Sequence, residues 1–167
     1  MNTATMTRSL KVSVGVVSFM VLATVAAVAM IKALPLPDLV RQADLVVVAT
    51  VESISQASVD REQISTMKNV LKLDKTLKGD WAAAQPLVVL TQQRGAYGEV
   101  GSLEDQVEFP KAGKQVLLFL KKAGPDKLAL VNDLQGVWPI EGDKLHGFGT
   151  GVKMSAVVEV IESQRLN

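Results

Sequence analysis

The feature that most constrains this chain is an unbroken apolar segment near its N-terminus. Val12–Ile31, VSVGVVSFMVLATVAAVAMI, has 20 residues without a charge, Asn, Gln or Pro. As an α-helix it would be about 30 Å long, which matches the hydrocarbon core of a bilayer. The segment therefore predicts one membrane crossing at the start of the chain, as a transmembrane or signal helix.

The residues before this segment predict its direction. Arg8, Lys11 and the amino terminus precede it, and residues 1–33 contain no acidic residue. Cytoplasmic flanks of membrane helices are enriched in Lys and Arg. We therefore expect residues 1–11 in the cytoplasm and the folded part of the chain on the far side of the membrane.

Two alternatives remain open for the segment. A signal peptide would use Val12–Ala26 as its apolar region and would be cleaved near Ala29, in the small-residue sequence AVA. An uncleaved anchor would use the full run to Ile31, and the apolar run continues through the candidate cleavage site, which favours the anchor. An anchor predicts a protein of the cell envelope, and cleavage predicts a periplasmic or secreted protein. Both predict a linker at 32–37 and an extracytoplasmic domain over 38–167.

The remainder of the chain alternates short apolar runs with turn residues. A helical turn capped by Asp38 comes first, residues 55–65 predict a polar loop, and a helix over 155–166 capped by Ser155 comes last. This order predicts a mainly β fold, a small antiparallel barrel, rather than the alternating strands and helices of a nucleotide-binding α/β fold. The predicted strands are Leu45–Ile54, which begins as a continuous apolar run typical of a strand buried on both faces, Asn69–Leu77, Leu87–Thr91, Val116–Leu120, Leu128–Val131 and Val137–Ile140.

The segment VLKLDKTLKGD, residues 70–80, fits two local structures. As a helix it would gather its lysines, with Lys68, in one basic stripe. As a strand it would place Leu71, Leu73 and Leu77 on one face, and its β-branched residues favour this second structure. We therefore predict a strand, with Lys75 on the inner face and its stem reaching the rim.

These segments follow one another in an order that resembles a known family. The order ADLVVVATVESI, VLKLDKTLKGD, LVVLTQ, GKQVLLFLKKAG and LALVNDLQGVWPI is similar to that of netrin-like, or tissue-inhibitor-of-metalloproteinase-like, OB-fold modules, in particular uncharacterised exported bacterial ones. The resemblance covers roughly residues 38–163 and implies an OB-like barrel with a C-terminal helix. Inhibitor members chelate zinc through an N-terminal cysteine, which this chain lacks, so no inhibitor residue is carried over.

Composition argues against several classes of function. The chain has no cysteine and one histidine, which excludes disulfides and cysteine-rich zinc sites and leaves few groups for histidine-based catalysis. Beyond residue 33 it has 15 basic and 17 acidic residues, a net charge of −2. A slightly acidic body with few aromatic residues is a poor nucleic-acid binder. We therefore predict no cofactor, no metal and no nucleic acid.

Individual residues give only weak functional signals. Trp81 follows a turn, which predicts a half-exposed side chain and a contact with a partner. Trp138 lies in an apolar run and predicts a core residue, and His146 predicts an exposed loop residue rather than a general base. Three further patterns match no complete motif and predict solvated loops or turns: the acidic residues Glu99, Glu104, Asp105 and Glu108, the serines Ser55, Ser58 and Ser65, and GFGTG at 147–151.

The sequence thus predicts a non-enzymatic module, membrane-anchored or secreted, that binds a protein partner or belongs to an assembly of the cell envelope. Two alternatives come from other classes of protein. One is an extracytoplasmic hydrolase that uses carboxylate or serine groups in a cleft. The other is a module similar to a protease inhibitor.

Overall fold

The computed structural model describes residues 33–61, 64–81, 86–94, 107, 109–124 and 127–166. Residues 31–167 belong to one compact unit. The predicted membrane segment Val12–Ile31 lies outside the described residues. Of the helices that the structure describes, none has the length and apolar character needed to cross a membrane.

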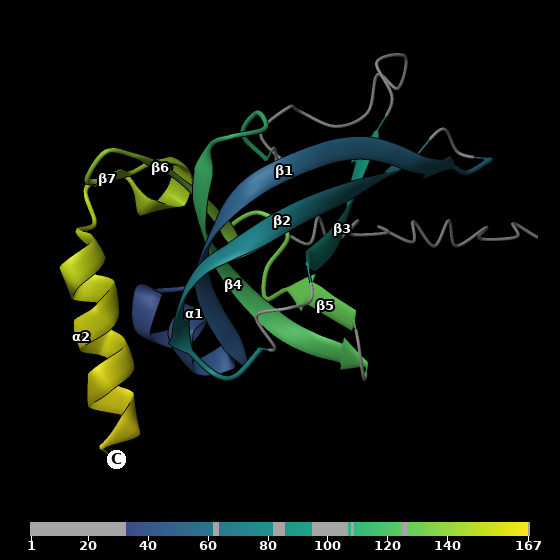
Figure 1. Ribbon diagram of the computed structural model, residues 1–167. Coiled ribbons are helices and arrows are strands. Elements are labelled where there is room, and N and C mark those ends of the chain that lie inside the picture. Colours follow the sequence, from purple (N-terminus) through teal and green to yellow (C-terminus); the bar gives the residue numbers. More distant parts are fainter. Residues whose placement is uncertain are drawn as a thin grey trace, which may run out of the picture. The chain divides into compact units, whose positions relative to one another are not determined.

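The described part of the chain is mainly β, with a helix at each end (Figure 1). The elements in chain order are α1 (Leu36–Gln42), β1 (Leu45–Val59), β2 (Ile64–Lys78), β3 (Leu87–Arg94), β4 (Gln115–Gly124), β5 (Lys127–Leu130), β6 (Val137–Glu141), β7 (Lys144–Leu145), the 3₁₀ turn η2 (Gly147–Gly149) and α2 (Met154–Arg165).

Five of the strands close into a barrel. The strand order is β1-β2-β3-β5-β4, and β4 pairs back onto β1. The neighbouring strands are antiparallel except β3 and β5, which run parallel and meet at Val89 and Leu128. The β6–β7 hairpin pairs with the first half of β4, Gln115–Leu118, on the edge opposite β1. The prediction of a small β-barrel between two helical pieces is therefore confirmed.

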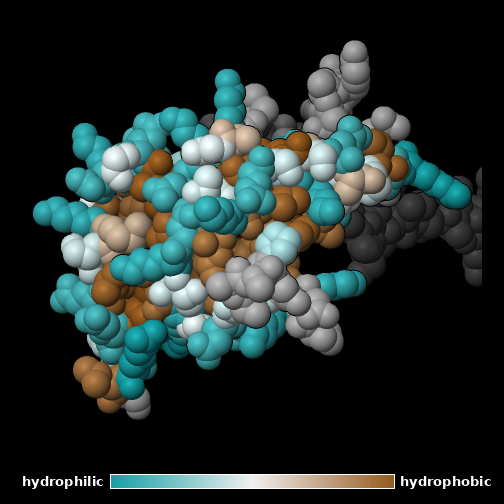
Figure 2. Space-filling model, viewed as in Figure 1, coloured by the Kyte–Doolittle hydropathy of each residue, from teal (hydrophilic) through white to brown (hydrophobic). Residues whose placement is uncertain are grey.

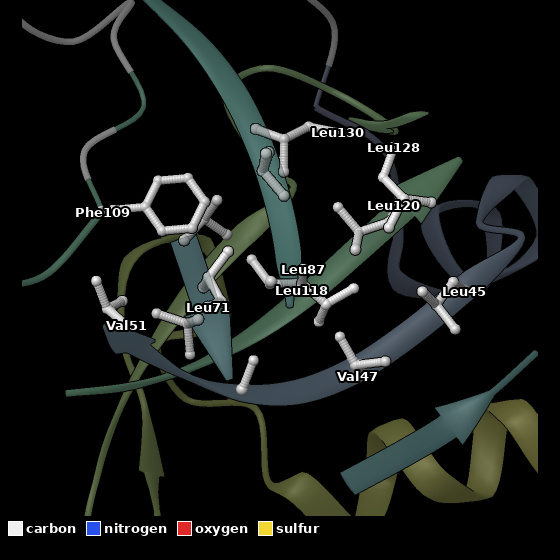
Figure 3. Packing of buried hydrophobic residues seen from close by; sticks show 14 of the residues in the cluster. Leu45, Val47, Val51, Leu71, Leu87, Phe109, Leu118, Leu120, Leu128 and Leu130 are labelled. Atoms are coloured by element: carbon white, nitrogen blue, oxygen red, sulfur yellow. The ribbon is translucent and has the colours of Figure 1, made fainter. Parts of the chain in front are cut away.

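Two apolar clusters share the backbone of β1 and β4. Side chains at alternate positions, such as Val47 and Leu118, point into the barrel, where Figure 3 shows them packed together. The intervening positions, such as Val46 and Phe119, point outward and are covered by α1 and α2. This arrangement confirms the prediction that the first strand is buried on both faces, because Leu45, Val46 and Val47 are each at most 1% exposed.

The lysine-rich segment is a strand, as predicted, but its details differ. Leu71 and Leu73 face the barrel interior, whereas Leu77 packs in the outer cluster. Pairing with β1 shifts at Asp74, which lies between the residues paired with Val48 and Ala49. The prediction of an inward Lys75 is therefore wrong: the irregularity returns Lys75 to the solvent-exposed face.

The predicted loop at residues 55–65 is also wrong. β1 continues to Val59 and β2 begins at Ile64, so most of this segment is strand. Asp60 closes the hairpin, because its backbone N–H donates to the Ile64 carbonyl at 3.0 Å and its carboxylate accepts from the Ile64 N–H at 2.8 Å. Polar side chains do not prevent a strand here, because strand pairing rather than burial holds it in place.

Both predicted helix caps are wrong. α1 begins at Leu36 after Pro35, so Asp38 lies inside the first turn, where its carboxylate contacts Arg41 at 2.6 Å. Pro37 suits the first turn because it lacks an N–H, and this turn leaves its N–H groups unbonded. α2 begins after Lys153, and Ser155 lies within the helix.

Candidate functional site

The strongest site feature is an open hollow beside Trp81, where β2 ends. The chain turns at Gly79, whose φ of +77° suits glycine. A side chain at this position would also overlap the Asp44 carbonyl oxygen. Two residues after this turn, the partly buried Trp81 packs against the inner cluster. The hollow has a volume of about 540 Å³ and is lined by Thr76, Leu77, Gly79, Asp80, Trp81 and Arg165.

The end of α2 forms one side of this hollow. An Arg165 guanidinium N–H donates to the Leu77 carbonyl at 2.9 Å, and the Gln164 amide donates to the Pro37 carbonyl at 2.8 Å. These bonds fix the last turn of α2 against β2 and α1. Arg165 remains solvent-exposed, so its guanidinium is accessible beside Trp81.

Lys78 lies next to the residues of the hollow and joins β2 to α1. Its ammonium donates to the Val40 carbonyl near the end of α1 at 2.7 Å. Partial burial lowers the pKa of Lys78 below its ordinary value of 10.5, and the nearby Asp44 carboxylate opposes part of this shift. Lys78 thus supports the α1 side of the structure rather than lining the hollow.

Trp138 is a core residue, as predicted. It is 3% exposed and meets Phe119 edge to face, with 4.9 Å between the ring centroids. Its indole nitrogen is buried and has no hydrogen-bond partner among the described residues. Gly149 packs against the ring, since a side chain there would place its first carbon 2.5 Å from the indole Cε3.

The glycine-rich segment 147–151 serves the backbone, as predicted. It forms the turn η2, with φ of +64° at Gly147 and +84° at Gly151, conformations that favour glycine. No bound group is needed to explain these glycines. His146 precedes the turn with 43% of its side chain exposed, and its Nε2 lies 3.6 Å from the Glu141 carboxylate. The sequence did not reveal this partner, which the β6–β7 hairpin brings near.

The predicted serines do not form a nucleophilic site with the histidine. Ser55 and Ser58 are exposed on the far half of β1, and Ser65, on β2, accepts a hydrogen bond from the Gln56 amide on β1 at 3.4 Å. His146 lies instead after the β6–β7 hairpin. The acidic residues Glu99, Glu104, Asp105 and Glu108 fall outside the described residues. Within the described ranges, no three His, Cys, Asp or Glu side chains group as a metal site.

The sequence singled out Trp81 but not Arg165, its neighbour in the hollow. The two residues are 84 positions apart in the chain, and only the packing of α2 beside β2 brings them together. The one sequence feature that pointed to Arg165 is its position in the last turn of the predicted C-terminal helix.

Comparison with protein-family models finds none that matches this chain, and comparison with curated proteins finds no significant match. The resemblance to netrin-like modules therefore stays a prediction from the quoted sequence segments.

Proposed function

We propose that this chain is an extracytoplasmic binding module, and that the hollow beside Trp81 contacts a protein partner in the cell envelope. The observation that carries the proposal is the pairing of an aromatic ring and a guanidinium on one open surface. Tryptophan and arginine are the residue types that most often dominate the binding energy of protein interfaces. Here Trp81 is partly buried and held by the barrel, and Arg165 is held by the Leu77 carbonyl.

The contacts that position both side chains support an interface at this place. Binding costs entropy when flexible side chains become ordered, and a preformed site reduces this cost. The tight turn at Gly79 and the bond from Gln164 in the last turn of α2 to Pro37 both contribute to a preformed hollow. Asp80 adds a carboxylate to the same surface, so a partner with both an apolar and a charged group matches its chemistry.

We further propose that the barrel is of the OB type, as in netrin-like modules. Support comes from its strand order, in which β1, β2 and β3 form a meander and β4 closes onto β1. A closed or nearly closed five-stranded barrel of this kind characterises the OB scaffold, which serves many unrelated ligands. The scaffold itself therefore does not select the partner.

The location of the module rests on the apolar segment at Val12–Ile31 and the basic residues before it. The absence of cysteine allows a direct test, since Lys111→Cys places a single thiol on an exposed residue. A membrane-impermeant maleimide added to intact cells should label this variant of the full chain. Labelling only after the cells are opened would contradict the proposed location, and N-terminal sequencing would distinguish an anchor from a cleaved signal.

Photo-cross-linking in intact cells tests the partner contact. A photoreactive amino acid at Thr76, which lines the hollow, should give a discrete adduct larger than the protein. The same group at Gln92, which is exposed on β3, is the matched control and should give none. Trp81→Ala in the Thr76 background should remove the adduct. Equal adducts from both positions, or an adduct that survives Trp81→Ala, would contradict the proposal.

A further inference from the structure

The chain is fastened to the folded domain as soon as it enters it. Both backbone groups of Leu34 bond to the side-chain amide of Gln135, the N–H at 2.6 Å and the carbonyl at 3.2 Å. Gln135 is 4% exposed, so water competes little for these two bonds. We call this pair of residues the clamp. From Leu34 onward the chain is therefore part of the domain and not of a free tether.

The loop that supplies Gln135 is itself held in place. The Asn132 side-chain oxygen accepts from the backbone N–H groups of Leu134 at 2.9 Å and Gln135 at 3.2 Å. The Gly136 N–H donates to the Asn132 carbonyl at 2.8 Å, and the Gly136 carbonyl accepts from Phe119 of β4 at 3.0 Å. The clamp therefore joins the entering chain to a loop that is bonded to the barrel.

Only a short stretch of chain separates the clamp from the predicted membrane segment. Val12–Ile31 ends three positions before Leu34, and Lys32 follows it directly, as is common where a helix leaves the hydrocarbon. Three residues span at most about 11 Å when fully extended. The headgroup layer outside the hydrocarbon core is about 5–8 Å thick on each side. An anchored chain therefore keeps the clamp in the headgroup layer or within a few ångströms of it.

The surface around the clamp suits this environment. Ala33, Pro35 and Asp133 are exposed there, and Leu34 and Leu134 are partly exposed. The charge on this surface is the carboxylate of Asp133, which would be costly in the hydrocarbon but remains hydrated among headgroups. The surface can therefore lie on the bilayer without entering its apolar core.

The short link, and not insertion of the domain, accounts for this position. On the face that Figure 2 draws, hydrophilic side chains divide the hydrophobic ones of the described residues into separate patches. This face offers no broad apolar surface of the kind that marks a membrane contact. The position of the domain is therefore expected to depend on the length of the link before Leu34.

We propose that the surface around the clamp, formed by residues 33–35 and 131–135, lies against the phospholipid headgroups of the membrane that anchors the chain. The inference rests on the proposed location of the module. It goes beyond the hollow beside Trp81, because no residue of the clamp surface lines that hollow. The domain then stays beside the bilayer with one surface toward it and does not move freely on a tether.

Fluorescence quenching by spin-labelled lipids tests the contact. The chain has no cysteine, so Asp133→Cys in the full chain carries a single fluorescent probe at the clamp surface. Asp143→Cys is the matched control, since Asp143 is also exposed and lies beyond the other end of β6. In phosphatidylcholine vesicles with nitroxide headgroups, the Asp133 probe should be quenched at least about threefold more strongly, because β6 spans about 17 Å between the two positions. Equal quenching would overturn the proposal.

Lengthening the link tests its role directly. About 20 Gly and Ser residues inserted between Lys32 and Ala33 allow an average separation of about 25 Å. Quenching of the Asp133 probe should then fall to the level at Asp143. The same insertion between Thr5 and Met6, before the apolar segment, is the control and should leave the quenching unchanged. Quenching that survives the insertion before Ala33 would overturn the proposal.

The outcomes separate this inference from the proposed location. A full chain that stays in the membrane but shows equal quenching at Asp133 and Asp143 overturns the contact alone. A mature chain that begins after Ala29 has lost its anchor, which overturns the contact as well. In both cases maleimide labelling of Lys111→Cys still reports the side of the membrane on which the domain lies.

Discussion

Gln135 and Leu34 hold each other by two hydrogen bonds although they lie 101 positions apart in the chain. The Leu34 N–H donates to the Gln135 side-chain oxygen at 2.6 Å, and the Gln135 amide donates to the Leu34 carbonyl at 3.2 Å. Gln135 is 4% exposed, so its amide group has little access to water. This pair fixes the segment before α1 against the loop that precedes β6.

Loss of this pair should destabilise the domain. Gln135→Ala leaves two backbone groups of Leu34 without their partner, and each unsatisfied buried group costs about 1–3 kcal/mol. We expect the free energy of unfolding, measured by urea denaturation, to fall by about 2 kcal/mol. Gln92→Ala, at an exposed position on β3, is the matched control and should change it by less than about 0.5 kcal/mol. Equal effects of the two substitutions would contradict the role assigned to Gln135.

The turn at Gly79 should tolerate substitution less well than the turn at Gly113. Both have positive φ, +77° and +84°, so alanine strains the backbone at each. Only at Gly79 would the added carbon overlap another residue, the Asp44 carbonyl, whereas Gly113 has nothing within 4 Å. Strain alone costs about 1–2 kcal/mol, so Gly79→Ala should lower the unfolding free energy more than Gly113→Ala. A smaller loss at Gly79 would show that the Asp44 segment moves aside readily.

Lys78 should make the stability of the domain depend on alkaline pH. Burial lowers the pKa of Lys78 in the folded state below 10.5. The unfolded state therefore binds the Lys78 proton more tightly than the folded state does. The contribution of this group to stability therefore increases as pH rises from the folded pKa toward 10.5. Lys78→Gln should remove this increase, measured as the change in melting temperature with pH relative to the wild type. A parallel pH dependence in both proteins would contradict the shift.

Arg165 should affect partner binding more than stability. Its guanidinium is exposed, and an exposed hydrogen bond of this kind contributes at most about 1 kcal/mol. Arg165→Ala should therefore leave the melting temperature within a few degrees and still reduce the photo-adduct formed at Thr76. Arg165→Lys keeps the charge but loses the planar donor group, so it should restore the adduct only in part. An adduct unchanged by Arg165→Ala would remove this residue from the proposed interface.

Much of the barrel was predictable from the spacing of apolar residues. The continuous run at the start of β1 correctly indicated burial on both faces, and the leucines at 71 and 73 correctly indicated an inward face. Periodicity succeeded at these positions because a buried face imposes it on the sequence.

The errors occurred where burial does not determine the structure. Residues 55–59 are all exposed, so their strand depends on pairing with β2, which periodicity does not report. The pairing irregularity at Asp74 changes which side chains of β2 face inward. No residue type in this segment indicates such an irregularity in the sequence. Predicting the hollow beside Trp81 would have required placing Arg165 next to it. No local sequence pattern relates two residues so far apart.

The double burial of β1 and β4 changes how their alignment is specified. In a sheet with one wet face, sliding a strand by one residue exposes apolar side chains, and this cost selects the alignment. Here the alternate sets that contain Val46 and Val47 are both apolar, so polarity cannot distinguish the native alignment from a slipped one. Shape must do so instead, through large side chains such as Phe119, which packs in the outer cluster with residues of both helices. Exchanging a large and a small apolar residue at neighbouring positions should therefore disturb the strand alignment of this protein. The same exchange should have a smaller effect in a sheet with one solvent-exposed face.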